Sequence, residues 1–246
     1  MRGLFTYFVF GSWWVAICAA SLGLLTWFEL TNFWWNAPLF TFILGSTLVI
    51  YNLNMISGLK ELREMGTDSE RHHWCMEHET LMKITLGIGL ALSAISVWFL
   101  NPVIWLLMTP LGLVALAYAA PIVRRNTAKI RIREIGLWKI FIIAIVWAGM
   151  TAILPAVNRF GLEQVLDGLS WKLATERAIF ILAITIPFDV RDLVNDAKKG
   201  VRTIPSTIGW KQSVILANGL LVLFGFLIYS RLGLGSNGLV CMGYLI

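Results

Sequence analysis

The sequence predicts an all-α protein, a polytopic bundle of transmembrane helices with seven full spans and part of an eighth. Of its 246 residues, 58% are hydrophobic and only 14% are charged, and the mean hydropathy is +0.75. A soluble domain needs roughly 25–35% charged residues on its surface, so this composition excludes a soluble fold. The apolar residues gather in runs of about 20, the length that crosses a bilayer as a helix. We expect residues 1–246 to form a single integral-membrane domain.

The predicted spans follow one another with short polar connections. Asn101-Pro102 separates the third from the fourth, because the residue before a proline disfavours helix. The sixth span is short, so we expect it to begin nearer Trp171. An eighth span opens at 238–246 but is too short to cross a bilayer; we expect a stub or, as its length favours, a truncated product. The full spans are 4–28, 37–56, 83–100, 103–122, 137–156, 178–189 with its flanks, and 213–230.

The basic residues predict the orientation of the chain. Most of the 20 Lys and Arg residues lie at the N-terminus or in the segments 60–83, 124–139 and 191–211, which are alternate connections. Cytoplasmic loops of membrane proteins carry the excess of Lys and Arg. We therefore expect the N-terminus and these segments in the cytoplasm, in a bacterial inner membrane. The net charge of +6 reflects this topology, and we expect no nucleic-acid partner.

Three acidic residues lie at the mouth of the sixth span: Asp189, Asp192 and Asp196. Their spacing of three and then four residues places them on one face of a helix. Three like charges on one face repel each other, and a bilayer nearby makes them costly to desolvate. A cation relieves both costs, and carboxylate oxygens suit Mg²⁺ whose coordination is completed by substrate phosphates. The sequence thus predicts that these three residues bind Mg²⁺ and are catalytic.

Basic and phenolic side chains near the aspartates are candidates for contact with a diphosphate. Lys198, Lys199 and Arg202 follow the acidic residues directly and can donate to phosphate oxygens; setting the topology or contacting anionic lipids is the alternative role. Lys139 lies near the start of a span, where it contacts phosphate or extends to the lipid headgroups. Tyr118 lies at the cytoplasmic boundary, as a substrate contact or a residue of the aromatic belt.

These residues resemble the UbiA superfamily of intramembrane prenyltransferases over essentially the whole chain. The segment after the sixth span is similar to the second aspartate-rich motif of that family: Asp189-x-x-Asp192-x-x-x-Asp196-x-x-x-Gly200-x-x-Thr203-x-Pro205. Tyr118-Ala119-Ala120-Pro121, followed by the basic run to Lys139, resembles the loop after the fourth span. The resemblance implies a cytoplasm-facing cavity closed by charged loops.

The end of the second span departs from the first aspartate-rich motif of the family. Aligned on Asn52, the three expected aspartates are Leu53, Ile56 and Lys60. Asn52 and Asn54 offer neutral oxygens, as site ligands or as interfacial amides, but no carboxylate remains. We hypothesise that Lys60 contacts phosphate directly and replaces a metal ion with a protein cation.

The resemblance implies transfer of a prenyl group from an isoprenoid diphosphate to a lipophilic acceptor in the bilayer, with Mg²⁺ assisting ionisation of the diphosphate. The expected acceptor is aromatic and similar to a quinone precursor. The alternative is a non-catalytic membrane protein of the same fold that binds prenyl diphosphate or lipid. A transporter is disfavoured, because the acidic residues lie at one surface and not at the middle of the bilayer.

One cytoplasmic connection contains every histidine of the chain. The three histidines and a neighbouring cysteine have a spacing that could bind zinc. The segment is also typical of an amphipathic loop helix capped by Asp68 or Ser69. We favour the helix, and the family resemblance suggests that this loop covers the diphosphate site. The residues of the set are His72, His73, Cys75 and His78.

Overall fold

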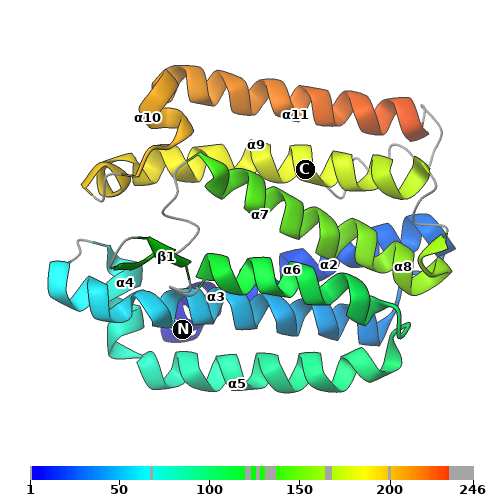
Figure 1. The fold of residues 1–246 in the computed structure, drawn as a ribbon, viewed down its shortest axis with the longest axis horizontal. Helices are drawn as coiled ribbons and strands as arrows, with labels where there is room; N and C mark the ends of the chain where they lie inside the picture. Colours follow the sequence, from blue (N-terminus) through cyan, green and yellow to red (C-terminus); the bar gives the residue numbers. More distant parts are fainter. Residues whose placement is uncertain are drawn as a thin grey trace.

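The computed structural model shows a bundle of long helices lying side by side along one direction (Figure 1). This confirms the helical membrane fold. A small exception is a two-stranded antiparallel ladder at one end, in which β1 (Val123–Arg125) pairs with β2 (Ala128–Ile130). The structure describes residues 2–66, 69–119, 123–125, 128–130, 137–163, 168–198 and 201–232.

The predicted first span, 4–28, is two helices and not one. α1 (Arg2–Phe10) ends before Gly11, and α2 (Trp13–Thr31) begins after Ser12. Ser12 has a φ of 70°, a left-handed conformation that interrupts the helix. Hydropathy did not reveal this break, because the residues on both sides of it are apolar. α1 has 9 residues and is too short to cross a bilayer.

The next helices form the lower half of the bundle in Figure 1. α3 starts where the Asn36 side chain accepts a hydrogen bond from the amide of Leu39 at 3.0 Å, with Pro38 in the first turn. This is the usual chemistry of a helix N-terminus. The elements are α3 (Ala37–Met65), α4 (Glu70–Glu77), α5 (Glu79–Ser96), a 3-10 turn (Val97–Phe99) and α6 (Ile104–Ala119).

The second half of the chain forms the upper layer in Figure 1. α9 is the longest of these helices, with 31 residues, and begins three residues before Trp171, near the predicted start of the sixth span. α7 runs into α8 through a π-helical segment without leaving the helical path. The elements are α7 (Trp138–Ala148), the π-helical segment (Gly149–Ile153), α8 (Leu154–Phe160), α9 (Gly168–Lys198), α10 (Ile204–Ile208) and α11 (Trp210–Leu232).

Among the described residues, five helical segments are long and apolar enough to cross a membrane. α6 is apolar but shorter, and α9 carries charged residues towards both ends. The count of seven spans therefore stays a prediction, and the predicted eighth span at 238–246 lies outside the described residues. The five segments are Trp13–Thr31, Ala37–Lys60, Glu79–Phe99, Trp138–Phe160 and Trp210–Arg231.

Small residues allow α3 and α5 to approach each other closely. A Cβ added to Gly89 would lie 2.8 Å from the Gly45 carbonyl oxygen, and one added to Gly45 would lie 2.7 Å from that of Gly89. The hydroxyls of Ser46 and Ser93 are hydrogen-bonded across the same interface at 3.3 Å. Close packing with small residues and hydroxyl groups is typical of helix pairs in membranes.

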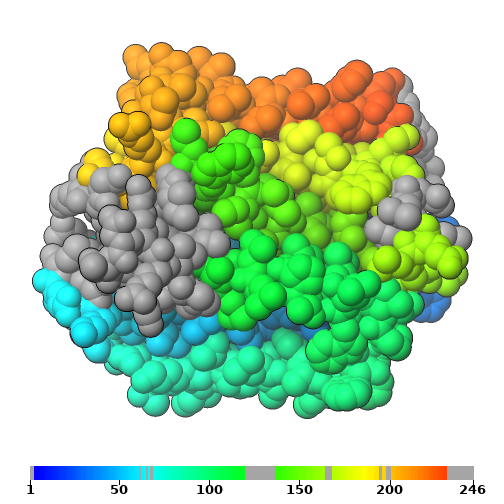
Figure 2. All heavy atoms as spheres, viewed as in Figure 1, coloured from blue at the N-terminus to red at the C-terminus, as the bar shows by residue number. Residues whose placement is uncertain are grey.

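The outer faces of the helices are apolar. Figure 2 shows α5 along one edge of the molecule and α11 along the other. On α11, Ile215, Val222 and Phe226 are 71%, 73% and 63% exposed. Exposed apolar surface of this extent indicates contact with lipid.

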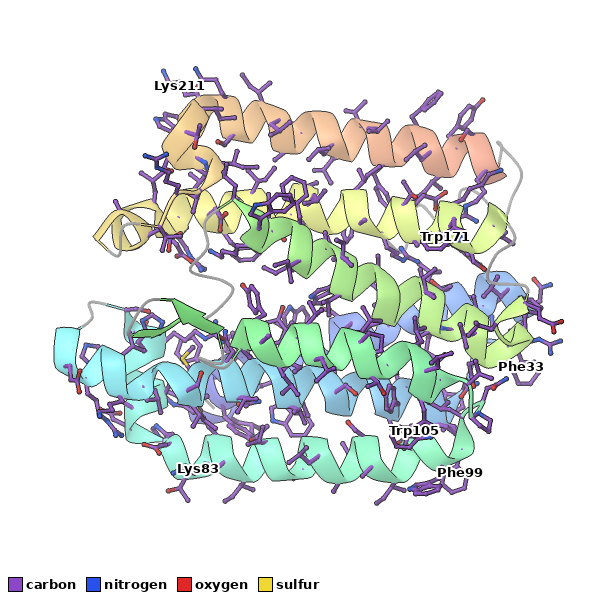
Figure 3. All side chains as sticks on the ribbon, viewed as in Figure 1. Phe33, Lys83, Phe99, Trp105, Trp171 and Lys211 are labelled. Carbon is purple, nitrogen blue, oxygen red and sulfur yellow. The ribbon has the colours of Figure 1, made fainter. Side chains whose placement is uncertain are left out.

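The two ends of the bundle carry different side chains. Figure 3 shows Lys83 and Lys211 at one end and the aromatic residues Phe33, Phe99, Trp105 and Trp171 towards the other. Aromatic residues gather at both membrane interfaces, and an excess of basic residues is typical of cytoplasmic loops. The cytoplasmic orientation of the lysine end stays a prediction.

A buried ion-pair cluster joins α2, α9 and α11 at the end of the bundle where Trp171 lies. Arg231 donates two hydrogen bonds of 2.8 Å to the Glu176 carboxylate, and its Nη2 lies 3.2 Å from an oxygen of Glu29. Arg177, 3% exposed, donates to the Thr26 hydroxyl at 3.4 Å. The sequence analysis did not predict this cluster. Charged residues within apolar helices could have indicated it, because such residues usually pair with one another inside a membrane bundle.

Candidate functional site

The candidate site forms where the start of α7 meets the second half of α9. The ammonium of Lys139 lies 2.8 Å from Oδ1 of Asp189 and 3.7 Å from Oδ2 of Asp196. Asp189 is only 3% exposed, and 18% of the Lys139 side chain is exposed. One protein cation therefore contacts two of the three predicted aspartates.

Apolar packing directly beside these residues positions the ion pairs. Ile140 follows Lys139 on α7, Ile186 precedes Asp189 on α9 by three residues, and both pack against Ala217 of α11. All three side chains are at most 4% exposed. The contact between Lys139 and Asp189 thus depends on how α7, α9 and α11 pack together.

Asp192 has a different partner from the other two aspartates. Its carboxylate accepts hydrogen bonds from Nε and Nη2 of Arg191 at 2.8 and 3.1 Å, and 38% of its side chain is exposed. In the described part of the chain, no three acidic, histidine or cysteine side chains come together closely enough to hold a metal ion. Metal binding by all three aspartates stays a prediction.

Burial and the neighbouring charges both affect the pKa of Asp196. Burial is the larger effect and raises the pKa of its carboxyl group, while the charge of Lys139 lowers it and those of Asp189 and Asp192 raise it. Its Oδ2 is buried and has no hydrogen-bond partner among the described residues. A buried carboxylate oxygen without a hydrogen bond is a position that a cation would stabilise.

The residues present fit a magnesium ion held by two carboxylates. Asp189 and Asp196 both face Lys139, and Asp196 has the buried oxygen without a hydrogen bond. Mg²⁺ in proteins is commonly bound by one or two carboxylates together with water and substrate phosphates. Asp189 and Asp196 would hold the ion, and its role would be to neutralise charge on a phosphate group.

The segment after α9 folds back beside the site. The amide of Val201 donates to the carbonyl of Asp196 at 2.9 Å, and the Thr203 amide donates to the Ser206 hydroxyl at 2.8 Å. Between these anchors Arg202 is exposed. Lys198 ends α9, and Lys199 lies outside the described residues.

The candidate ligands from the second and fourth predicted spans are placed on α3 and α6. Asn52 is fully buried, and its amide donates to the carbonyls of Leu48 at 2.8 Å and Gly11 at 3.3 Å. It therefore supports the break between α1 and α2. Asn54 is half-buried and Lys60 is exposed.

Tyr118 lies in the last turn of α6. The next residue is tied to α3, because the Ser57 hydroxyl donates to the carbonyl of Ala119 at 2.8 Å. The α3 and α6 segments that carry the candidate ligands are thus joined to each other. No comparison tests the substrate role of these residues, which stays a prediction.

The histidine-containing connection forms α4, which confirms the predicted loop helix. Ser69 precedes the helix but its side chain makes no capping hydrogen bond, and Asp68 lies outside the described residues. Cys75 is fully buried with Leu59 and Met82, and burial raises the pKa of its thiol. The ring of Trp74 stacks on that of His78 with centroids 4.5 Å apart. A buried thiol with a raised pKa is a poor metal ligand, so the zinc alternative gains no support.

No protein-family model matches the chain, and no curated protein matches it in sequence. A solved structure of similar fold is that of a digeranylgeranylglyceryl phosphate synthase in membranes. The TM-score is 0.56 and the sequence identity 20%, over 93% of this chain and 77% of that chain. At this identity the likeness shows the fold alone, and that fold agrees with the helical bundle expected from the resemblance.

Proposed function

We propose that the protein is an intramembrane prenyltransferase that moves a prenyl group from an isoprenoid diphosphate to a lipophilic acceptor. The observation that carries this proposal is the meeting of Lys139, Asp189 and Asp196 at one end of a bundle with this fold. Lysine donates to phosphate oxygens, and carboxylates bind the divalent ion that accompanies a diphosphate. The apolar helices around them suit a prenyl chain.

In the proposed reaction the bond between the allylic carbon and the diphosphate oxygen breaks, and its electron pair leaves with the diphosphate. A nucleophilic atom of the acceptor forms the new bond to that carbon, and the acceptor releases a proton. Mg²⁺, when bound, supplies neutralisation of charge on the leaving group. Lys139 and Arg202 would stabilise the same negative charge by donating hydrogen bonds. The bundle would exclude water from the reacting carbon.

The remaining candidate residues are proposed as substrate contacts. Lys198 and Lys199 follow the aspartates in sequence, and Asn52, Asn54, Lys60 and Tyr118 lie on α3 and α6. Lys60→Ala tests the hypothesis that Lys60 replaces a metal ion. An affinity for inorganic diphosphate equal to that of the wild type would remove this role.

The proposed acceptor is an aromatic, quinone-precursor-like compound. Because the solved structure of similar fold is a digeranylgeranylglyceryl phosphate synthase, a prenylated glyceryl phosphate is the second acceptor to test. Transfer to one of these compounds and not to the other would identify the acceptor class.

The test is release of diphosphate from a panel of prenyl diphosphates by the purified protein in lipid nanodiscs, with Mg²⁺ or with chelator. We expect release that depends on metal and falls about 10–100-fold or more in Asp189→Asn and Asp196→Asn. Glu163→Gln, which removes an exposed carboxylate at the far end of the bundle, is the matched control. Metal-dependent binding of prenyl diphosphate without release would identify the non-catalytic alternative.

A further inference from the structure

We propose that Lys139 is the resident counter-cation of the aspartate site, so that a divalent metal enters this site together with a diphosphate and not before it. This inference rests on the proposed function, because it assigns an order of binding to the same site. It makes Lys139 a positioning residue for the metal as well as a contact for phosphate.

The position of the ammonium is the first argument. Nζ of Lys139 lies 2.8 Å from Asp189 and 3.7 Å from Asp196, which lie about two turns apart on α9. A metal ion bridging the same two carboxylates would have to share this space with a positive charge. Repulsion between the two cations disfavours that arrangement as long as Lys139 stays in place.

The charge of the site is the second argument. Asp189 and Asp196 carry two negative charges when both are ionised, and Lys139 neutralises one of them. Asp192 is engaged by Arg191. The site therefore offers a divalent ion about one net negative charge, too little for tight binding without further anionic ligands.

A diphosphate changes both the repulsion between Lys139 and the metal and the net charge of the site. It brings anionic oxygens that complete the coordination of the metal, and it gives the lysine ammonium a new partner. Lysine has a flexible four-carbon stem and three donors, so it can turn from a carboxylate to a phosphate without movement of the helix. The carboxylates that Lys139 releases then become available to the metal.

The experiment is equilibrium dialysis of Mn²⁺ against the wild-type protein in uncharged lipid nanodiscs, with and without inorganic diphosphate. We expect weak retention of Mn²⁺ alone and an apparent affinity about tenfold higher or more when diphosphate is present. Asp196→Asn in the same nanodiscs gives the background of metal bound elsewhere. Equal retention of Mn²⁺ by the wild type with and without diphosphate would overturn the proposal, whatever any variant does.

Substitutions of Lys139 test whether its charge is the reason that Mn²⁺ alone binds weakly. Lys139→Met removes the charge and keeps the length, and we expect it to bind Mn²⁺ alone about tenfold more tightly than the wild type and to lose most of the diphosphate effect. Lys139→Arg keeps the charge and should keep the wild-type order. Lys172→Met, an exposed lysine near the opposite end of α9, is the matched control.

The outcomes separate this inference from the proposed function. A folded Lys139→Met protein that binds Mn²⁺ no better than the wild type would show that Lys139 only holds α7 against α9. Tight binding of Mn²⁺ alone by a wild type that still releases diphosphate would overturn the order of binding and leave prenyl transfer intact. Retention of neither Mn²⁺ nor diphosphate by the wild type would count against both.

Discussion

Burial raises the pKa of Asp196, the charge of Lys139 lowers it, and the charges of Asp189 and Asp192 raise it further. Burial is the larger effect, so the folded protein holds this proton at pH values where the unfolded chain, with an aspartate pKa of about 3.9, has released it. Over this window the folded state binds more protons than the unfolded state, and stability must fall as pH rises.

We therefore expect the wild type to lose thermal stability relative to Asp196→Asn as pH rises from about 4, until Asp196 is ionised in the folded state as well. The measurement is the melting temperature in nanodiscs across this range, without metal. Glu163→Gln, which changes an exposed carboxylate away from the aspartate site, is the control. A difference between wild type and Asp196→Asn that does not change with pH would contradict the expectation.

Arg231 is the central residue of the buried cluster with Glu176 and Glu29. Arg231→Met leaves two carboxylates without this cation in a site where 12% or less of each of the three side chains is exposed. We expect a loss on the order of 3 kcal/mol in the free energy of unfolding, measured by thermal or denaturant unfolding.

An exposed arginine elsewhere in the bundle provides the control for Arg231. Arg159→Met removes an exposed arginine that lies over the Phe160 ring, and it should cost under about 1 kcal/mol. Addition of Glu29→Gln and Glu176→Gln to Arg231→Met should restore part of the loss, because no buried charge then lacks its partner. Equal effects of Arg231→Met and Arg159→Met would be evidence against a stabilising cluster.

At the scale of the elements, the contact between α3 and α5 depends on glycine. In Gly89→Ala the added methyl group would lie 2.8 Å from the Gly45 carbonyl oxygen and 3.0 Å from Leu48 Cβ, so the helices must separate. We expect a loss of about 1–3 kcal/mol. Gly87→Ala, two residues earlier on the same helix, meets nothing within 4 Å and should be neutral or stabilising by up to about 1 kcal/mol. The measurement is the free energy of unfolding of the two variants, determined in parallel. A decrease in Gly87→Ala as large as that in Gly89→Ala would contradict the role of Gly89 in the contact between α3 and α5.

The elements also show where hydropathy succeeds and where it does not. The segment 137–156 was predicted as one span and is one continuous helical path through α7, the π-helical segment and α8. The segment 4–28 was predicted in the same way, but Ser12 divides it. Hydropathy is summed over all the residues of a segment, whereas a break in a helix depends on the backbone conformation of one or two residues.

At the scale of the whole molecule, the basic residues gathered at one end of the bundle predict the orientation in the membrane; Lys83 and Lys211 are two of them (Figure 3). We expect the end with Lys83, Lys211 and the aspartate site to face the cytoplasm. In a background without the native cysteines, Lys172→Cys should react with an impermeant maleimide on intact cells, and Lys211→Cys only after permeabilisation. The reverse pattern would invert the topology and place the aspartates outside.

The sequence by itself determined the membrane class, most of the helical segments and the grouping of acidic residues after the sixth span. These properties depend on hydrophobic length and on the three- and four-residue spacing within one helix, which are local. Only the tertiary structure decided that Lys139 pairs with Asp189, 50 residues away, that Asp192 has a different partner, and that Arg231 meets Glu29. Such contacts depend on how helices distant in sequence pack against one another, and hydropathy and spacing within a single helix do not contain that information.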